Sequence, residues 1–274
     1  MTTTAPRMGV PQTPLADIEI TISDRPEDVD EALRVVHDGF VEAGFMTPRP
    51  SGRRMHLSYL NPGTTFFVAR MDGTPVGASA LVADGPFGLP SDRAFAEEND
   101  ALRNAGAGVV HESGSLSVLR THRRHTRRIL TRLIAAMSRV VHDDYPTAPI
   151  PIAVAPENLR FYQALVDAEL VGESRLLYGA PAILMCTSGL RISSHVSARR
   201  TPIARTMDML FNDVHPDWLA DRRTGEPLPG DWLAPLVRES EAAARLLHQA
   251  GVLEALIGRR EPAPRARRSG VLAA

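Results

Sequence analysis

The chain contains no lysine, and all 31 of its basic residues are arginine. The absence of lysine excludes Schiff-base chemistry by a side-chain amine. It also means that the cations other than histidine are planar guanidinium groups of fixed charge, which can bind an anion with two hydrogen bonds. Cysteine is almost absent too, and Cys186, with no second thiol available, cannot form an internal disulfide.

Long apolar segments are also missing. No run of about 18 apolar residues occurs, and the first residues have no apolar core of the signal-peptide kind. We therefore expect a soluble, cytoplasmic protein without a transmembrane segment.

Several signatures of ligand chemistry are absent as well. The nine histidines show no metal-ligand spacing, so no metal site is expected. The sequence has no phosphate-binding P-loop, no G-x-S-x-G motif and none of the glycines of a dinucleotide fingerprint. The net charge is −1 and no aromatic residues alternate with the arginines, which argues against a nucleic-acid partner.

What is present is typical of a globular α/β protein of 274 residues. Apolar patterns and turn residues predict a mixed central sheet flanked by helices, with a meander of strands joined in part by the Asp72-Gly73 hairpin. The predicted strands are 18–22, 65–70, 76–82, 109–119, 150–154, 176–178 and 182–186. The predicted helices are 24–42, 52–59, 92–104, 127–141 and 157–168.

Changes in composition divide the chain into four parts. Residues 1–16 are polar and proline-rich and are predicted to be disordered. Residues 17–189 form the α/β domain, and 190–258 are predicted to be a helical C-terminal extension. Residues 259–274 read as a basic, disordered tail.

The strongest indication of chemistry is Glu112, in the strand predicted over 109–119. Strict alternation puts Glu112, Gly114, Leu116 and Val118 on one face of the strand, and His111 on the other. A carboxylate on a mostly apolar face is partly desolvated, which raises its pKa towards that of a general base. The alternative is a structural salt bridge between Glu112 and one of the arginines.

The segment 120–132 follows at once and contains six arginines, two histidines and no acidic residue. It lies where a helix is expected to begin, so backbone N–H groups and the helix dipole favour an anion there. The phosphate of a phosphopantetheine arm is one candidate, and a solvated basic helix face is the other reading. Further on, Tyr162 lies about two turns into a helix that begins near Pro156, as a general acid or as a core aromatic.

Three segments together resemble a known family. They are Gly88-Leu-Pro-Ser-Asp92 with Phe95, Glu112-Ser-Gly-Ser-Leu-Ser-Val118, and Ala155-Pro-Glu-Asn-Leu-Arg-Phe-Tyr162 followed by Gly179-Ala-Pro-Ala-Ile-Leu184. In this order, residues 18–187 resemble the GNAT acyltransferases. Within them they are most similar to the FeeM-type N-acyl amino acid synthases, relatives of the acyl-homoserine lactone synthases.

The resemblance implies attack of a small amine or amino acid on an acyl thioester. Glu112 matches the base, the backbone N–H near Val118 the group that polarises the thioester carbonyl, and Tyr162 the general acid. No cofactor is expected to be tightly bound. The donor would be held by a set drawn from the strand end and the loop: Leu116, Val118, Arg120, Arg123, Arg124, Thr126, Arg127 and Arg128.

Two departures from the family pattern bear on the substrates. Thr126 and Arg128 stand where coenzyme A-binding loops have glycine, which favours acyl carrier protein over acyl-coenzyme A as donor. Gly114 and Ser115 replace the Ser-Arg pair of the family strand, so the acceptor is open. A coenzyme A-dependent N-acetyltransferase and a non-catalytic, carrier-binding GNAT-like module remain the alternatives.

Overall fold

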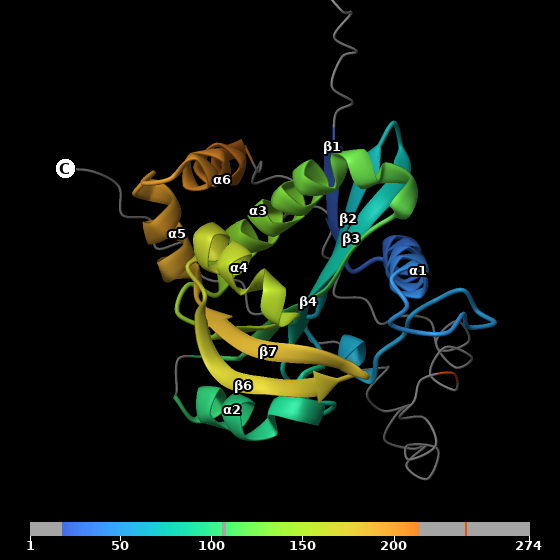
Figure 1. Cartoon of the computed structure of the whole chain (residues 1–274), viewed down its shortest axis with the longest axis horizontal. Coiled ribbons are helices and arrows are strands. Elements are labelled where there is room, and N and C mark those ends of the chain that lie inside the picture. The colour runs from blue at the N-terminus through green and yellow to red at the C-terminus, as the bar shows by residue number, and fades with distance from the viewer. Residues whose placement is uncertain (1–17, 106–107, 214–238, 240–274) are drawn as a thin grey trace, which may run out of the picture.

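The structure, a computed structural model, describes residues 18–105, 108–213 and 239 (Figure 1). The segments predicted to be disordered, 1–16 and 259–274, and most of the helical extension lie outside the described residues. Within the described part, no helix is both long and apolar enough to cross a membrane.

Seven described strands form two antiparallel sheets. The first has the order β1-β2-β3-β4 and is the predicted meander; its strands are Ile18–Ser23, Thr65–Met71, Thr74–Ala83 and His111–Val118. The second has the order β5-β7-β6, with strands Ile150–Val154, Ala180–Thr187 and Glu169–Leu177. The predicted α/β fold with flanking helices is therefore confirmed, with its sheet divided in two.

The two sheets meet where β4 and β5 begin. The N–H of His111 donates to the carbonyl of Pro149 at 3.1 Å, directly before β5. Beyond this bond no ladder joins β4 to β5 in the described residues. The two strands are therefore not paired with each other towards their C-terminal ends. The edge of β4 near Val118 is consequently left open for another group.

Helices cover both faces of the first sheet (Figure 1). Helix α1, Pro26–Glu42, packs on one face, where its Leu33 and Val36 join an apolar cluster with Val82 of β3. Helix α3, Thr126–Asp144, packs on the other face, and α4, Leu159–Val166, lies beside it. Helix α2, Asp92–Asn104, covers the second sheet through Phe95.

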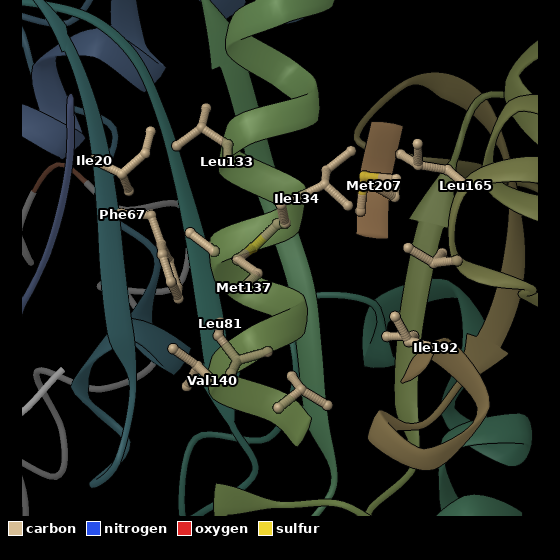
Figure 2. Packing of buried hydrophobic residues seen from close by; sticks show 14 of the residues in the cluster. Ile20, Phe67, Leu81, Leu133, Ile134, Met137, Val140, Leu165, Ile192 and Met207 are labelled. Atoms are coloured by element: carbon tan, nitrogen blue, oxygen red, sulfur yellow. The ribbon is translucent and has the colours of Figure 1, made fainter. Parts of the chain in front are cut away.

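The sequence of α3 predicts an apolar stripe of Ile129, Leu130, Leu133, Met137 and Val140, most of which is buried. Ile129, Leu133, Met137 and Val140 are buried against the first sheet, and Leu130 is only partly buried. Figure 2 shows Leu133, Met137 and Val140 directed towards β2 and β3. This packing fixes α3, and with it the arginine-rich loop that precedes the helix.

The first part of the predicted extension belongs to the same core. Helices α5, Gly189–Ser197, and α6, Pro202–Asp213, place Ile192, Val196 and Met207 in the cluster that α3 organises (Figure 2). The boundary predicted at residue 189 therefore does not separate two cores. The remainder of the extension lies outside the described residues.

Two local predictions differ from the structure. The helix expected over 52–59 is only the short 3-10 helix η1, Leu57–Leu60. Strand β6 begins at Glu169 instead of near 176. The first part of the strand was not predicted because Leu170, Val171 and Leu176 are exposed and the burial of its residues does not alternate. An edge strand without a regular apolar face is hard to identify from periodicity.

The close approach of α3 to β3 depends on Gly77. A Cβ at this position would lie 2.7 Å from Cγ2 of Ile129. We expect Gly77→Ala to lower the free energy of unfolding by about 1–3 kcal/mol, because the added methyl overpacks this contact. In the double variant Gly77→Ala/Ile129→Ala the new methyl enters the space that Ile129 leaves, so the loss should be smaller than the sum of the single losses. Urea denaturation of all four proteins measures this, and strict additivity would contradict the packing.

Candidate active site

Strand β4 contains one more residue than β3 opposite it. Gly114 pairs with Ala80 and Ser117 pairs with Ala78, so Ser115 and Leu116 together face the single residue Ser79. Ser115 has a φ of 55°, in the left-handed region. This is a β-bulge, which reverses the alternation of side chains along the strand beyond it.

The bulge contradicts the predicted face of Leu116 and Val118. Glu112 and Ser117 lie on the α1 face, where the Ser117 hydroxyl donates to the carbonyl of Val35 at 3.4 Å. Leu116 and Val118 instead pack with the cluster on the α3 face. The strict alternation assumed one residue per pleat step on both strands, and the extra residue at Ser115 breaks that assumption.

Glu112 is a buried carboxylate, 3 % exposed. Its Oε2 accepts hydrogen bonds from the N–H and the hydroxyl of Ser91, at 2.9 and 2.7 Å. Burial raises the pKa of Glu112 to about 7, and the Ser91 hydrogen bonds limit the rise. Within the described residues Glu112 has no ion-pair partner, which contradicts the salt-bridge alternative.

The other carboxylate oxygen, Oε1, is available. It accepts no hydrogen bond from the described residues, and it is not fully enclosed by them. Gly114 keeps the approach open, since even a Cβ there would lie 3.8 Å from Oε1. Glu112 is thus anchored by one oxygen and can accept a proton at the other.

Ser91 is held in turn by the start of α2. Its hydroxyl accepts from the side-chain amide of Asn99 at 2.8 Å, and the same amide donates to Asp92 at 2.8 Å. Arg103 then binds Asp92 at 2.7 Å and Asp84 at 2.7 Å. This chain of hydrogen bonds fixes the donors to Glu112, and only the turn before the helix could be predicted from the sequence.

A second polar cluster lies beside the bulge. Arg54 donates to the hydroxyl of Tyr59 at 2.8 Å and to that of Ser115 at 3.3 Å, and the two hydroxyls also bond each other. Tyr178 donates to the carbonyl of Pro90 at 2.8 Å, and its pKa is raised, chiefly by burial. The positive charge of Arg54 acts to lower the pKa of both Glu112 and Tyr178, so the cluster shares their electrostatic environment.

The sequence did not predict Arg54, Tyr59, Ser91 or Tyr178 as site residues. In that order, they come from a loop, from η1, from the turn before α2 and from the position directly after β6. These segments are distant from one another in sequence. Only Ser91, directly before a predicted helix, had a recognisable local signal, that of an N-cap residue.

The backbone N–H of Val118 points away from β3. The N–H of Leu119 donates to Val76 on β3 at 2.9 Å, and successive N–H groups of a strand point to opposite edges. The Val118 N–H therefore faces the opening between β4 and β5.

Tyr162 lies on the α3 side of β4. It lines a narrow apolar cavity of about 20 Å³ with Ser113 of β4 and Ile152 of β5, whereas Glu112 is on the other face of β4. Burial raises the pKa of Tyr162 to about 12, so the hydroxyl stays protonated at neutral pH. The two predicted catalytic side chains thus flank the strand without touching each other.

The arginine-rich loop is a 3-10 helix, η2, Arg120–His125, that leads into α3. In the described structure none of Arg120, Arg123, Arg124, Arg127 and Arg128 has an ion pair with a carboxylate. One nitrogen of Arg128, NH1, is buried without a partner, and no side chain caps α3. Slight burial and the charges of Arg124 and Arg128 lower the pKa of His125. The carboxylate of Glu42 lies against the loop, where it accepts from the backbone N–H of Arg120 at 2.9 Å. The loop still presents a cluster of guanidinium groups without ion-pair partners in the described structure.

No cluster of potential metal ligands occurs among the described residues. Cys186 is partly buried on β7, and burial raises the pKa of its thiol, so it is a poor nucleophile at neutral pH. This environment is that of a packing residue.

A family model described as N-acyl amino acid synthase FeeM matches residues 31–188. Among solved structures, FeeM, an N-acyl amino acid synthase from uncultured soil microbes, is 22 % identical with a TM-score of 0.53, and the match covers 70 % of this chain and 99 % of that one. The acyl-homoserine lactone synthase LasI is 12 % identical with a TM-score of 0.50, over 65 % and 96 % of the two chains. No curated protein sequence matches the chain.

The two structural similarities, at low identity, establish a shared fold. The family model goes further, because it spans more than half of the chain and includes Glu112, the arginine-rich loop and Tyr162. The chain is therefore an acyltransferase that belongs to the FeeM family of N-acyl amino acid synthases.

Proposed function

We propose that this enzyme transfers an acyl group from the phosphopantetheine thioester of acyl carrier protein to the amine of an amino acid or a related small amine. The observation that carries the proposal is Glu112, a buried carboxylate with a pKa of about 7, one anchored oxygen and one available oxygen. It lies on the strand whose far end has an open edge.

The reaction requires two proton transfers. Glu112 takes a proton from the attacking amine as nitrogen bonds to the thioester carbonyl carbon. The C–S bond then breaks, and the departing thiolate takes a proton from Tyr162, whose high pKa keeps its hydroxyl protonated until then. The amide and the free thiol of the carrier are the products.

The open edge of β4 suits the thioester. The Val118 N–H faces the opening and would donate to the carbonyl oxygen as negative charge develops on it. Glu112 and Tyr162 lie on opposite faces of this strand. The apolar cavity beside Tyr162 is the candidate entrance for the acyl chain, but about 20 Å³ holds only a water-sized group. A long acyl chain therefore requires neighbouring side chains to move.

The charge of the loop supports a protein-borne donor. Exposed Arg123, Arg124 and Arg127 have no carboxylate partners in the described structure, as suits docking of an acidic carrier surface. The buried, unpartnered nitrogen of Arg128 supports a phosphate next to the start of α3. Thr126 and Arg128 occupy positions where glycines would admit the pyrophosphate of coenzyme A.

Replacing Glu112 with glutamine should abolish turnover and preserve the fold. Folding raises the pKa of Glu112 from 4.5 to about 7, so the wild-type protein loses stability as pH rises from about 4.5 to about 7, where the unfolded chain is ionised and the folded one is still protonated. Glutamine does not ionise. Between pH 5 and pH 8 the free energy of unfolding of the variant should therefore rise relative to that of the wild-type protein, by at most about 3 kcal/mol in urea denaturation. The matched control is Glu173→Gln, an exposed change. Near wild-type rates at saturating acyl carrier protein would exclude the catalytic role.

The pH dependence of kcat/KM should report the same carboxyl group. Activity should fall as pH drops below about 7, because protonated Glu112 cannot accept the proton of the amine. The inflection should stay in place for acceptors with different amine pKa values, whereas any inflection from the amine itself should move. A profile without a common inflection near neutral pH would contradict the assignment.

Neutralising the loop should weaken the enzyme towards the carrier protein specifically. Arg123→Gln/Arg124→Gln should raise KM for acyl carrier protein by about 3- to 10-fold at low salt, with less effect at high salt. KM for a small acyl-pantetheine thioester should stay the same, because it has no protein surface. Arg200→Gln/Arg205→Gln removes two other exposed charges as the control. Equal losses with both donors, or a preference of the wild-type enzyme for acyl-coenzyme A, would refute a docking role.

A further inference from the structure

Arg54 is held in one orientation next to Glu112. Its backbone N–H donates to the carbonyl of Leu33 on α1 at 3.1 Å. Its NH1 nitrogen donates to the hydroxyls of Tyr59 and Ser115, at 2.8 and 3.3 Å. A guanidinium restrained at both ends loses little entropy on binding a ligand.

The surroundings of Arg54 contain rings and hydroxyl groups, and the nearby carboxylate of Glu112 forms no direct ion pair with it. The guanidinium carbon lies 4.5 Å from the ring centroid of Phe40 and 5.5 Å from that of Tyr178. In the described part of the chain Arg54 has no ion pair with a carboxylate, although it is partly buried. A partly buried guanidinium without a direct ion pair is costly, and an anionic ligand bound to it would offset this cost.

The rest of the guanidinium is accessible. Its Nε and NH2 nitrogens donate no hydrogen bond to the described residues, and neither nitrogen is fully enclosed by them. These two nitrogens form one side of the planar fork, the geometry that binds a carboxylate with two parallel hydrogen bonds. The available oxygen of Glu112 lies on the same face of the first sheet as the Arg54 cluster.

We infer that Arg54 binds the carboxylate of the acceptor and thereby selects α-amino acids over amines that lack a free carboxylate. The inference rests on the proposed function, because it concerns the acceptor of that reaction. Glu112 and Ser115, the residue that Arg54 contacts, are three positions apart in β4, which is at most about 10 Å because the bulge shortens the strand at Ser115. An amine and a carboxylate on one carbon, with a hydrogen bond at each end, span about 8–9 Å. The acceptor amine can therefore reach Glu112 while its carboxylate remains on Arg54.

The first experiment compares each of the twenty common amino acids with its carboxamide as acceptor for the wild-type enzyme, with acyl carrier protein as donor. The carboxamide keeps the amine and the side chain and removes only the negative charge. For accepted side chains we expect kcat/KM to be about 10- to 100-fold higher for the acid. Equal use of acid and carboxamide would overturn the inference.

The second experiment changes the guanidinium. Arg54→Gln should raise KM for the amino acid by about 10- to 100-fold and abolish the preference over the carboxamide, with KM for the acyl donor unchanged. Arg54→Lys should keep part of the preference, because charge remains without the fork. Arg200→Gln is the control for loss of an exposed arginine.

A role of Arg54 through Glu112 alone has a different signature. Arg54 lowers the pKa of Glu112, so its loss would shift the pH profile for both acceptors and leave their ratio unchanged. That result would overturn the inference. If Arg54→Gln fails to fold, thermal melting of the wild-type enzyme with the amino acid or its carboxamide decides instead, and stabilisation by both alike would count against Arg54.

The two proposals can fail separately. Transfer to amines with no preference for a carboxylate overturns the role of Arg54 and leaves the proposed function intact. Absence of transfer to every amine, with either thioester donor, overturns the proposed function itself.

Discussion

One extra residue in β4 determines how the site is arranged. The bulge at Ser115 leaves Glu112 facing α1 and η1, and turns Leu116 and Val118 towards α3. It also brings the Ser115 hydroxyl to Arg54. Without the bulge, the side chains of Glu112 and Val118 would share one face, and Ser115 would take the position of an ordinary strand residue. The proposed division between an acceptor side and a donor side of the strand depends on this local change of register.

The buried charge of Glu112 is the second constraint. Desolvation opposes its ionisation, and the two hydrogen bonds from Ser91 favour it, so the pKa settles at about 7. Ser91 is held by Asn99 of α2. Arg103, at the other end of α2, forms ion pairs with Asp92 and Asp100 of the same helix and with Asp84 outside it. The second sheet packs on α2 through Phe95, so the acidity of Glu112 is linked to the packing of both sheets.

Unpaired arginines lie at the two places where anions are proposed to bind. Elsewhere in the described chain several arginines, such as Arg103 and Arg191, are paired with carboxylates. Arg54 and the loop from Arg120 to Arg128 are not, and the first lies beside Glu112 while the second precedes α3. In a chain without lysine, both sites present guanidinium forks, which suit a carboxylate and a phosphate respectively.

The sequence alone determined much of the framework: the meander from β2 to β4, the apolar stripe of α3, Glu112 as the candidate base and the basic loop after it. These depend on local periodicity and composition, which a linear sequence carries. The tertiary structure alone decided the faces of Leu116 and Val118, because a β-bulge has no reliable signature in an alternating pattern. It also brought Arg54, Tyr59, Ser91 and Tyr178 to Glu112. These residues come from turns and element ends far apart in the chain, and only the packing of both sheets around α2 and α1 brings them together.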